Sequence, residues 1–70
     1  MNKNYEKILF DFFQLAKEMG IEDKAGKLFD VMTDLVEANA SNWVVYNTIT
    51  ANYVGKEREI LFYLWGRLSE

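Results

Sequence analysis

The chain has 70 residues and a net charge of −3, and it contains neither cysteine nor histidine. This composition excludes a disulfide framework, the usual zinc and haem ligands, and any mechanism that needs an imidazole base or a thiolate. A domain of this size buries only about 60% of its unfolded surface, so we expect association with another chain to supply part of its stability.

We expect no targeting signal in the first residues. The segment 1–13 has a basic start and an apolar run, but Asp11 interrupts that run and no small-residue cleavage site follows. The longest apolar run, 60–65, is far too short to span a bilayer. We therefore expect no membrane association and a cytoplasmic location. Since no repeat, proline or linker divides the chain, we expect one helical domain over residues 1–70.

Residues 5–19 predict an amphipathic helix. Asn4 or Asn2 can cap its start, and Gly20 followed by Ile21 predicts a left-handed stop. Phe10 breaks the pattern because it falls on the polar side, so it is either exposed or covered by another part of the protein. The predicted apolar face comprises Tyr5, Ile8, Leu9, Phe12, Phe13, Leu15, Ala16 and Met19.

Residues 22–38 predict a second amphipathic helix, which ends at Asn39. On its polar side, Asp30, Asp34 and Glu37 recur with helical spacing. These carboxylates lie on one helix, whereas a hard cation needs ligands that converge from several directions, so we expect no metal and interpret them as a solvated, partner-facing row. The predicted apolar face comprises Ala25, Leu28, Phe29, Val31, Met32, Leu35, Val36 and Ala38.

The segment 42–54 fits two structures. As a strand, its successive side chains would alternate between two faces, and its β-branched and aromatic residues favour that state. As a helix it can begin at a Ser41 or Asn42 cap. We favour a helix because the chain offers no convincing partner strand. The apolar face of that helix would comprise Trp43, Val45, Tyr46, Ile49, Tyr53 and Val54.

Residues 56–68 predict the last helix, and Gly55 either separates it from the preceding one or lies inside a single long helix. Phe62 lies nearly opposite Ile60, beside Gly66, and Tyr63 lies at the margin of the buried stripe. The predicted core stripe comprises Ile60, Leu61, Leu64, Trp65 and Leu68. Together these segments predict an all-α fold, a small bundle of three or four short helices.

The stretch LAKEMGIEDKAGKLF resembles a helix-turn-helix, with Ala16, then Gly20 in the turn, then Ile21. The quoted stretch, residues 15–29, covers about a fifth of the chain. It implies a small DNA- or RNA-binding regulator, which is the alternative function. The pattern departs from the family at Gly26, where a packing residue is expected. It also departs at Glu22 and neighbouring Asp23, which place negative charge where phosphate would bind.

The aromatic residues carry the main functional hypothesis, because 16% of the chain is aromatic. When each helix is assigned one buried face, four large apolar residues have no place in the core, which suggests a surface that a partner covers. These residues are Phe10, Val44, Phe62 and Tyr63. The competing interpretation is that the last helix is buried on two sides, so that Phe62 and Tyr63 are core residues.

With no motif that carries chemistry, we expect a non-enzymatic module without cofactor or metal that occupies a site on a larger protein. We expect a free-standing chain this short, which begins at its own methionine and lacks such chemistry, to act only in this way. Small inhibitors encoded by phages and mobile elements, including those directed against bacterial defence, have this profile. We expect a homodimer, with partner contacts at Phe10, Val44, Phe62, Tyr63, Asp30, Asp34 and Glu37. Nucleic acid is the less favoured partner.

Overall fold

The computed structural model describes residues 4–69, and its regular structure consists of helices. In chain order these are α1 (Tyr5–Glu18), α2 (Glu22–Glu37), α3 (Asn42–Asn52) and α4 (Gly55–Leu68). The predicted all-α bundle is confirmed. The ambiguous segment is the helix α3, and residues 4–69 contain no strand with which it could have paired.

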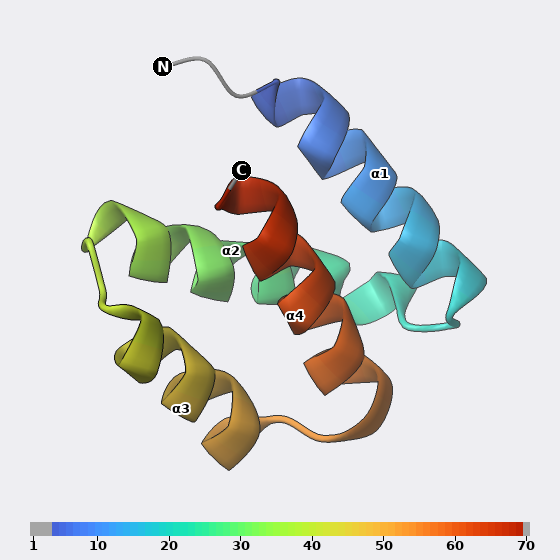
Figure 1. Ribbon diagram of the computed structural model, residues 1–70. Helices are drawn as coiled ribbons and strands as arrows, with labels where there is room; N and C mark the ends of the chain where they lie inside the picture. Colours follow the sequence, from blue (N-terminus) through green and yellow to red (C-terminus); the bar gives the residue numbers. More distant parts are fainter. Residues whose placement is uncertain (1–3, 70) are drawn as a thin grey trace.

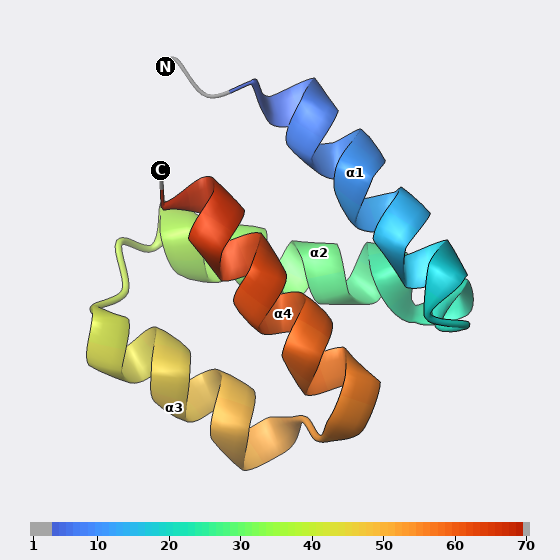
Figure 2. The same cartoon turned by 45° about the vertical axis from the view of Figure 1, so that its right-hand side comes forward.

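The four helices form a flat molecule, with Cα extents of 30 × 29 × 16 Å. In both views α4 lies between α1 and α3 and runs antiparallel to each, while α2 crosses behind α4 (Figures 1 and 2). The helices α1, α2 and α4 all pack on one another, whereas α3 packs chiefly on α4. Consequently, α3 has much less protein surface than the other helices on which to bury apolar side chains.

The turns that end α1 and α2 follow the sequence signals. Gly20 has a φ of +79°, and the N–H of Ile21 donates to the carbonyl of Ala16 at 2.9 Å. Asn39, with a φ of +59°, has the same role after α2, where the N–H of Ala40 reaches back into the last turn. In each case a left-handed residue lets the next N–H satisfy a free carbonyl of the helix. Both predicted stops are confirmed.

Two of the helix starts are capped by the expected side chains. Asn4 accepts a hydrogen bond from the N–H of Lys7 at 3.1 Å, and Ser41 accepts one from the N–H of Val44 at 3.3 Å. Gly55 has a φ of +61° and begins α4 after two extended residues. The open question about residues 42–68 is thereby answered, because they form two helices.

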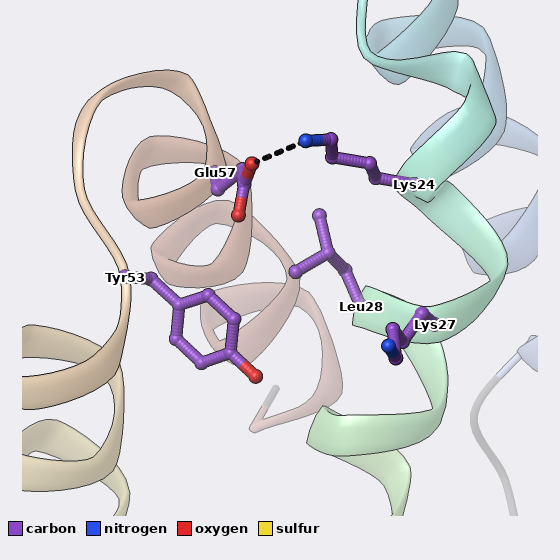
Figure 3. Close-up of a pocket in the computed structure, with 5 residues that line it drawn as sticks. All are labelled: Lys24, Lys27, Leu28, Tyr53 and Glu57. Carbon is purple, nitrogen blue, oxygen red and sulfur yellow. Dashed lines mark ion pairs between the residues drawn. The ribbon is translucent and has the colours of Figure 1, made fainter.

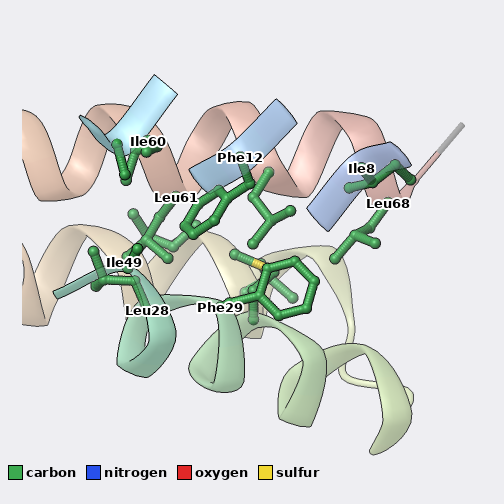
Figure 4. Packing of buried hydrophobic residues seen from close by; sticks show 13 residues of the cluster. Ile8, Phe12, Leu28, Phe29, Ile49, Ile60, Leu61 and Leu68 are labelled. Carbon is green, nitrogen blue, oxygen red and sulfur yellow. The ribbon is translucent and has the colours of Figure 1, made fainter. Parts of the chain in front are cut away.

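The core is apolar throughout the described residues, where no buried side chain is polar (Figure 4). The Phe29 ring lies 5.5 Å from that of Phe12 and 5.9 Å from that of Tyr5, centroid to centroid, and joins α2 to α1. None of the helices in the described part combines the length and apolar character of a membrane span. The buried residues are Ile8, Phe12, Ala16, Ala25, Leu28, Phe29, Met32, Val45, Ile49, Ile60, Leu61, Leu64 and Leu68.

The predicted buried face of α3 is the main error of the sequence analysis. Trp43 is 69% exposed, Tyr46 is 48% exposed and Val54 is 74% exposed. Since α3 packs chiefly on one neighbour, it buries only the narrow stripe formed by Val45 and Ile49. The predicted buried faces of the other helices also included residues that are not buried: Tyr5, Leu9 and Val36 are exposed, and Trp65 is only half-buried.

Candidate partner-binding surfaces

Four partly or largely exposed aromatic side chains of α3 and α4 define a surface, which we call the α3–α4 aromatic surface: Trp43, Tyr46, Phe62 and Trp65. The Phe62 ring centroid lies 5.9 Å from that of Tyr46 and 6.1 Å from that of Trp65. Trp43 and Tyr46 are three residues apart, which places them within about 60° of each other on the same flank of α3. The surface is therefore apolar, partly open and built from two helices.

Arg58 fixes the C-terminal end of α3 onto α4. Its Nε donates to the carbonyl of Tyr53 at 2.9 Å, and its second guanidinium nitrogen donates to the carbonyl of Thr50 at 2.8 Å. Carbonyls in the last turn of a helix have no partner within it, so a cation there both satisfies them and complements the helix dipole. The aromatic side chains of the two helices are thus held on a defined backbone.

The sequence-predicted apolar contacts do not converge on one site. Phe62 belongs to the α3–α4 aromatic surface, although Tyr46 and Trp65 leave it only half-exposed. Val44 is 44% exposed but is turned by about 100° from Trp43 around α3. Phe10 is on α1, on the other side of α4 (Figures 1 and 2). The single partner surface predicted from these residues is therefore divided among separate faces.

Tyr63 contributes to the contact between α4 and α1. Arg67 donates to the Tyr63 hydroxyl at 2.7 Å and to the Asp11 carboxylate at 3.1 Å. The hydrogen bond from Arg67 lowers the pKa of Asp11 below its ordinary value, against the opposing effect of desolvation, and the nearby charge of Lys7 acts in the same direction as Arg67. Tyr63 is thus engaged within the protein and is half-buried.

A second apolar area, which we call the α1 apolar surface, consists of Leu9, Phe10 and Phe13. With Glu6 these side chains line an open depression along α1. Phe10 is 63% exposed and Leu9 is 37% exposed. The first of the two outcomes considered for Phe10, exposure, is therefore the one observed, since no part of residues 4–69 covers it.

The predicted acidic row lies on the exposed side of α2. Asp30, Asp34 and Glu37 are all exposed, and the ion pairs within residues 4–69 do not include them. In the described part of the chain, no three carboxylates gather closely enough to hold a metal ion. Burial, with a smaller contribution from the Glu37 charge, raises the pKa of Tyr5 at the nearby start of α1.

A cleft of about 310 Å³ lies where α2 meets the beginning of α4 and the connection from α3. Figure 3 shows its lining, with the Lys24–Glu57 ion pair on one side of the Leu28 side chain and the Tyr53 hydroxyl directed into the space between the elements. The cleft was not predicted, because it joins residues from two separate regions of the sequence without any local motif: Lys24, Lys27, Leu28, Tyr53 and Glu57.

Comparison of the chain with protein-family models, with curated proteins and with solved structures finds no match. The functional interpretation therefore depends on the surfaces themselves.

Trp43 and Tyr46 were missed as surface residues, although the sequence held a signal for them: apolar residues of 42–54 are distributed almost all around the helix, so a one-sided contact must leave some exposed.

Proposed function

We propose that the protein is a non-enzymatic binding module that occupies a site on a larger protein, with the α3–α4 aromatic surface as the contact. The observation that carries this proposal is the exposure of Trp43, at 69%, beside Tyr46, at 48%. Trp and Tyr are the residue types most enriched at interface hot spots, since they offer a large contact area and have few rotatable bonds.

The setting of the two residues supports a role in binding. Exposed single apolar residues are ordinary, but here the Tyr46 ring packs at a tilted angle on Phe62, which in turn packs on Trp65. Tyr46, Phe62 and Trp65 already order one another, so a partner would spend little additional conformational entropy in ordering these three rings. Burial of such a preorganised aromatic group is the usual centre of a specific protein interface.

The charge of α2 supports a protein partner over nucleic acid. In the helix-turn-helix alternative, α2 would be the recognition helix, and its exposed residues include Glu22, Asp23, Asp30 and Asp34. Phosphate contacts provide most of the affinity of nucleic-acid binders, and negative side chains on the reading helix would repel them. The exposed acidic row fits better with a protein target that carries basic residues.

The finer parts of the proposal concern the class of target. We place the protein among small inhibitors encoded by phages or mobile elements that block a bacterial defence protein in the cytoplasm. The support is its profile: the 70 residues contain no histidine, no cysteine and no recognisable catalytic motif, and the described part exposes large aromatic side chains.

A homodimer is the second part of the proposal, and the α1 apolar surface supports it. Leu9, Phe10 and Phe13 are spaced as one ridge, and a twofold axis beside α1 would pair this ridge with its copy. Sedimentation equilibrium tests this directly. We expect the wild type to dimerise and Phe10→Ser to remain monomeric with unchanged helicity. A monomeric wild type at high concentration would contradict the dimer.

The partner-binding proposal is tested by affinity capture from a lysate of the native host with three matched baits. We expect one protein to be retained in equimolar amount by the wild type and by Lys17→Gln, a variant of an exposed α1 residue. Trp43→Ser should lose it, since removal of a hot-spot residue weakens binding by about thirtyfold or more. Equal capture by Trp43→Ser, with circular dichroism confirming all three folds, would contradict the assignment of the surface.

A further inference from the structure

The cleft between α2, the α3–α4 connection and α4 has the features of a small-ligand site. Its volume of about 310 Å³ falls at the lower end of the range for small-molecule pockets. Leu28, only 3% exposed, forms an apolar floor, and the Tyr53 ring forms a wall. Polar groups at the opening come from Lys24, Lys27 and Glu57 (Figure 3).

The polar groups of the cleft are unequally satisfied. Lys24 Nζ lies 3.3 Å from a carboxylate oxygen of Glu57, so these two charges compensate each other. Lys27 belongs to no ion pair within residues 4–69, and the Tyr53 hydroxyl takes part in none of the hydrogen bonds among those residues. The cleft therefore has a surplus of one positive charge and a hydroxyl available as a donor.

We infer that this cleft binds a carboxylate group carried on a small apolar body. One carboxylate balances the surplus charge of Lys27, whereas a phosphate dianion would leave a negative excess beside Glu57. One carboxylate oxygen accepts from the Tyr53 hydroxyl and the other from the Lys27 ammonium, while the apolar body rests on Leu28. The inference is independent of the partner-binding proposal, because the cleft lies at the end of α3 away from Trp43.

The test is a titration of the isotopically labelled protein with benzoate, followed by amide chemical shifts in NMR spectra. We expect the amides of residues 24–28 and 53–57 to shift, with a Kd of about 1 to 10 mM for so small a probe. Benzamide, which has the same shape without the charge, should bind at least about tenfold more weakly. Phenyl phosphate should not exceed benzoate in affinity.

Three variants identify the groups responsible. Tyr53→Phe keeps the ring and removes the hydroxyl, so the benzoate Kd should rise about threefold to tenfold. Lys27→Gln should raise it about tenfold, and Lys17→Gln, on α1 outside the cleft, should leave it unchanged. The amide spectrum of each variant shows whether it is folded. The inference is overturned if the cleft amides do not shift at about 20 mM benzoate, or if benzamide binds equally well. It is also overturned if phenyl phosphate binds more tightly, or if neither cleft variant changes the Kd.

A second probe distinguishes the source of the carboxylate. N-acetylglutamic acid α-amide presents only a side-chain carboxylate on a peptide backbone. Tighter binding than benzoate would assign the cleft to an acidic side chain of a protein, and weaker binding would assign it to a free small carboxylate. Both results support the carboxylate chemistry, and neither depends on whether the α3–α4 aromatic surface binds a partner.

Discussion

Replacement of Leu64 and of Phe62 by alanine should destabilise the protein to different extents, although the two residues are neighbours on α4. Leu64 is fully buried in the core, so Leu64→Ala removes buried methyl groups and leaves a cavity, at a cost of about 2 to 5 kcal/mol. A chain of 70 residues has a total stability of about 3 to 10 kcal/mol. Leu64→Ala should therefore leave the protein partly or fully unfolded.

Phe62→Ala should be much milder. Phe62 is only half-buried: it packs against the edge of the core, and its aromatic neighbours Tyr46 and Trp65 are themselves partly exposed. Loss of these contacts should cost about 1 to 2 kcal/mol. The protein should remain folded, with a lower melting temperature.

Urea titration followed by far-ultraviolet circular dichroism measures both values, and it avoids tryptophan fluorescence, which Phe62→Ala would itself alter through Trp65. Titrations at several protein concentrations separate folding from self-association. Equal destabilisation by the two substitutions would refute this reasoning, because it would mean that α4 is core on both sides. That was the competing interpretation of Phe62 at the level of sequence.

Three further predictions follow from particular residues. Gly20→Ala should lower the free energy of unfolding by about 1 kcal/mol, because alanine is strained at a left-handed φ. Gly26→Ala inside α2 should raise it by about 0.5 to 1 kcal/mol, because alanine is the better helix former. Urea titrations of both variants beside the wild type measure the changes, and changes of the same sign would contradict the turn geometry. Arg58→Met should accelerate amide hydrogen exchange in α3 more than in α1 and α2, and a uniform increase would mean that Arg58 does not specifically hold α3. The pKa of Asp11 is lowered in the folded protein, so ionised Asp11 stabilises the fold above its unfolded pKa, and this stabilisation is lost as the pH falls through the folded pKa. The stability of Asp11→Asn should therefore fall less steeply in acid than that of the wild type. Equal pH profiles of the two proteins would exclude this contribution.

Local signals predicted the helices well. Asn4, Ser41, Gly20 and Asn39 are short-range signals, since each acts within one turn of its own backbone, and each was found where the sequence placed it. The choice of helix for residues 42–54 was also correct, because the absence of a partner strand could be judged from the whole chain. The core of α4 followed from its helical spacing, with Trp65 as the exception.

Features that depend on packing between helices were not predictable in the same way. The periodicity of α3 gives the direction of each side chain but not the number of helices that cover it, so Trp43 and Tyr46 were assigned to a buried face that one neighbour cannot provide. The ion pair of Arg67 with Asp11 joins α4 to α1, and the cleft joins Lys27 to Tyr53. Neither arrangement has a local sequence signal.

The most direct test of the proposed function is a hydrogen–deuterium exchange footprint of the protein alone and in complex with the target that it captures. The α3–α4 aromatic surface predicts slower exchange in α3 and in the second half of α4 on binding, with little change in α1. Trp43→Ser should remove both the complex and the footprint. Protection confined to α1 and α2, with α3 unchanged, would contradict the central claim and place the contact on another face of the molecule.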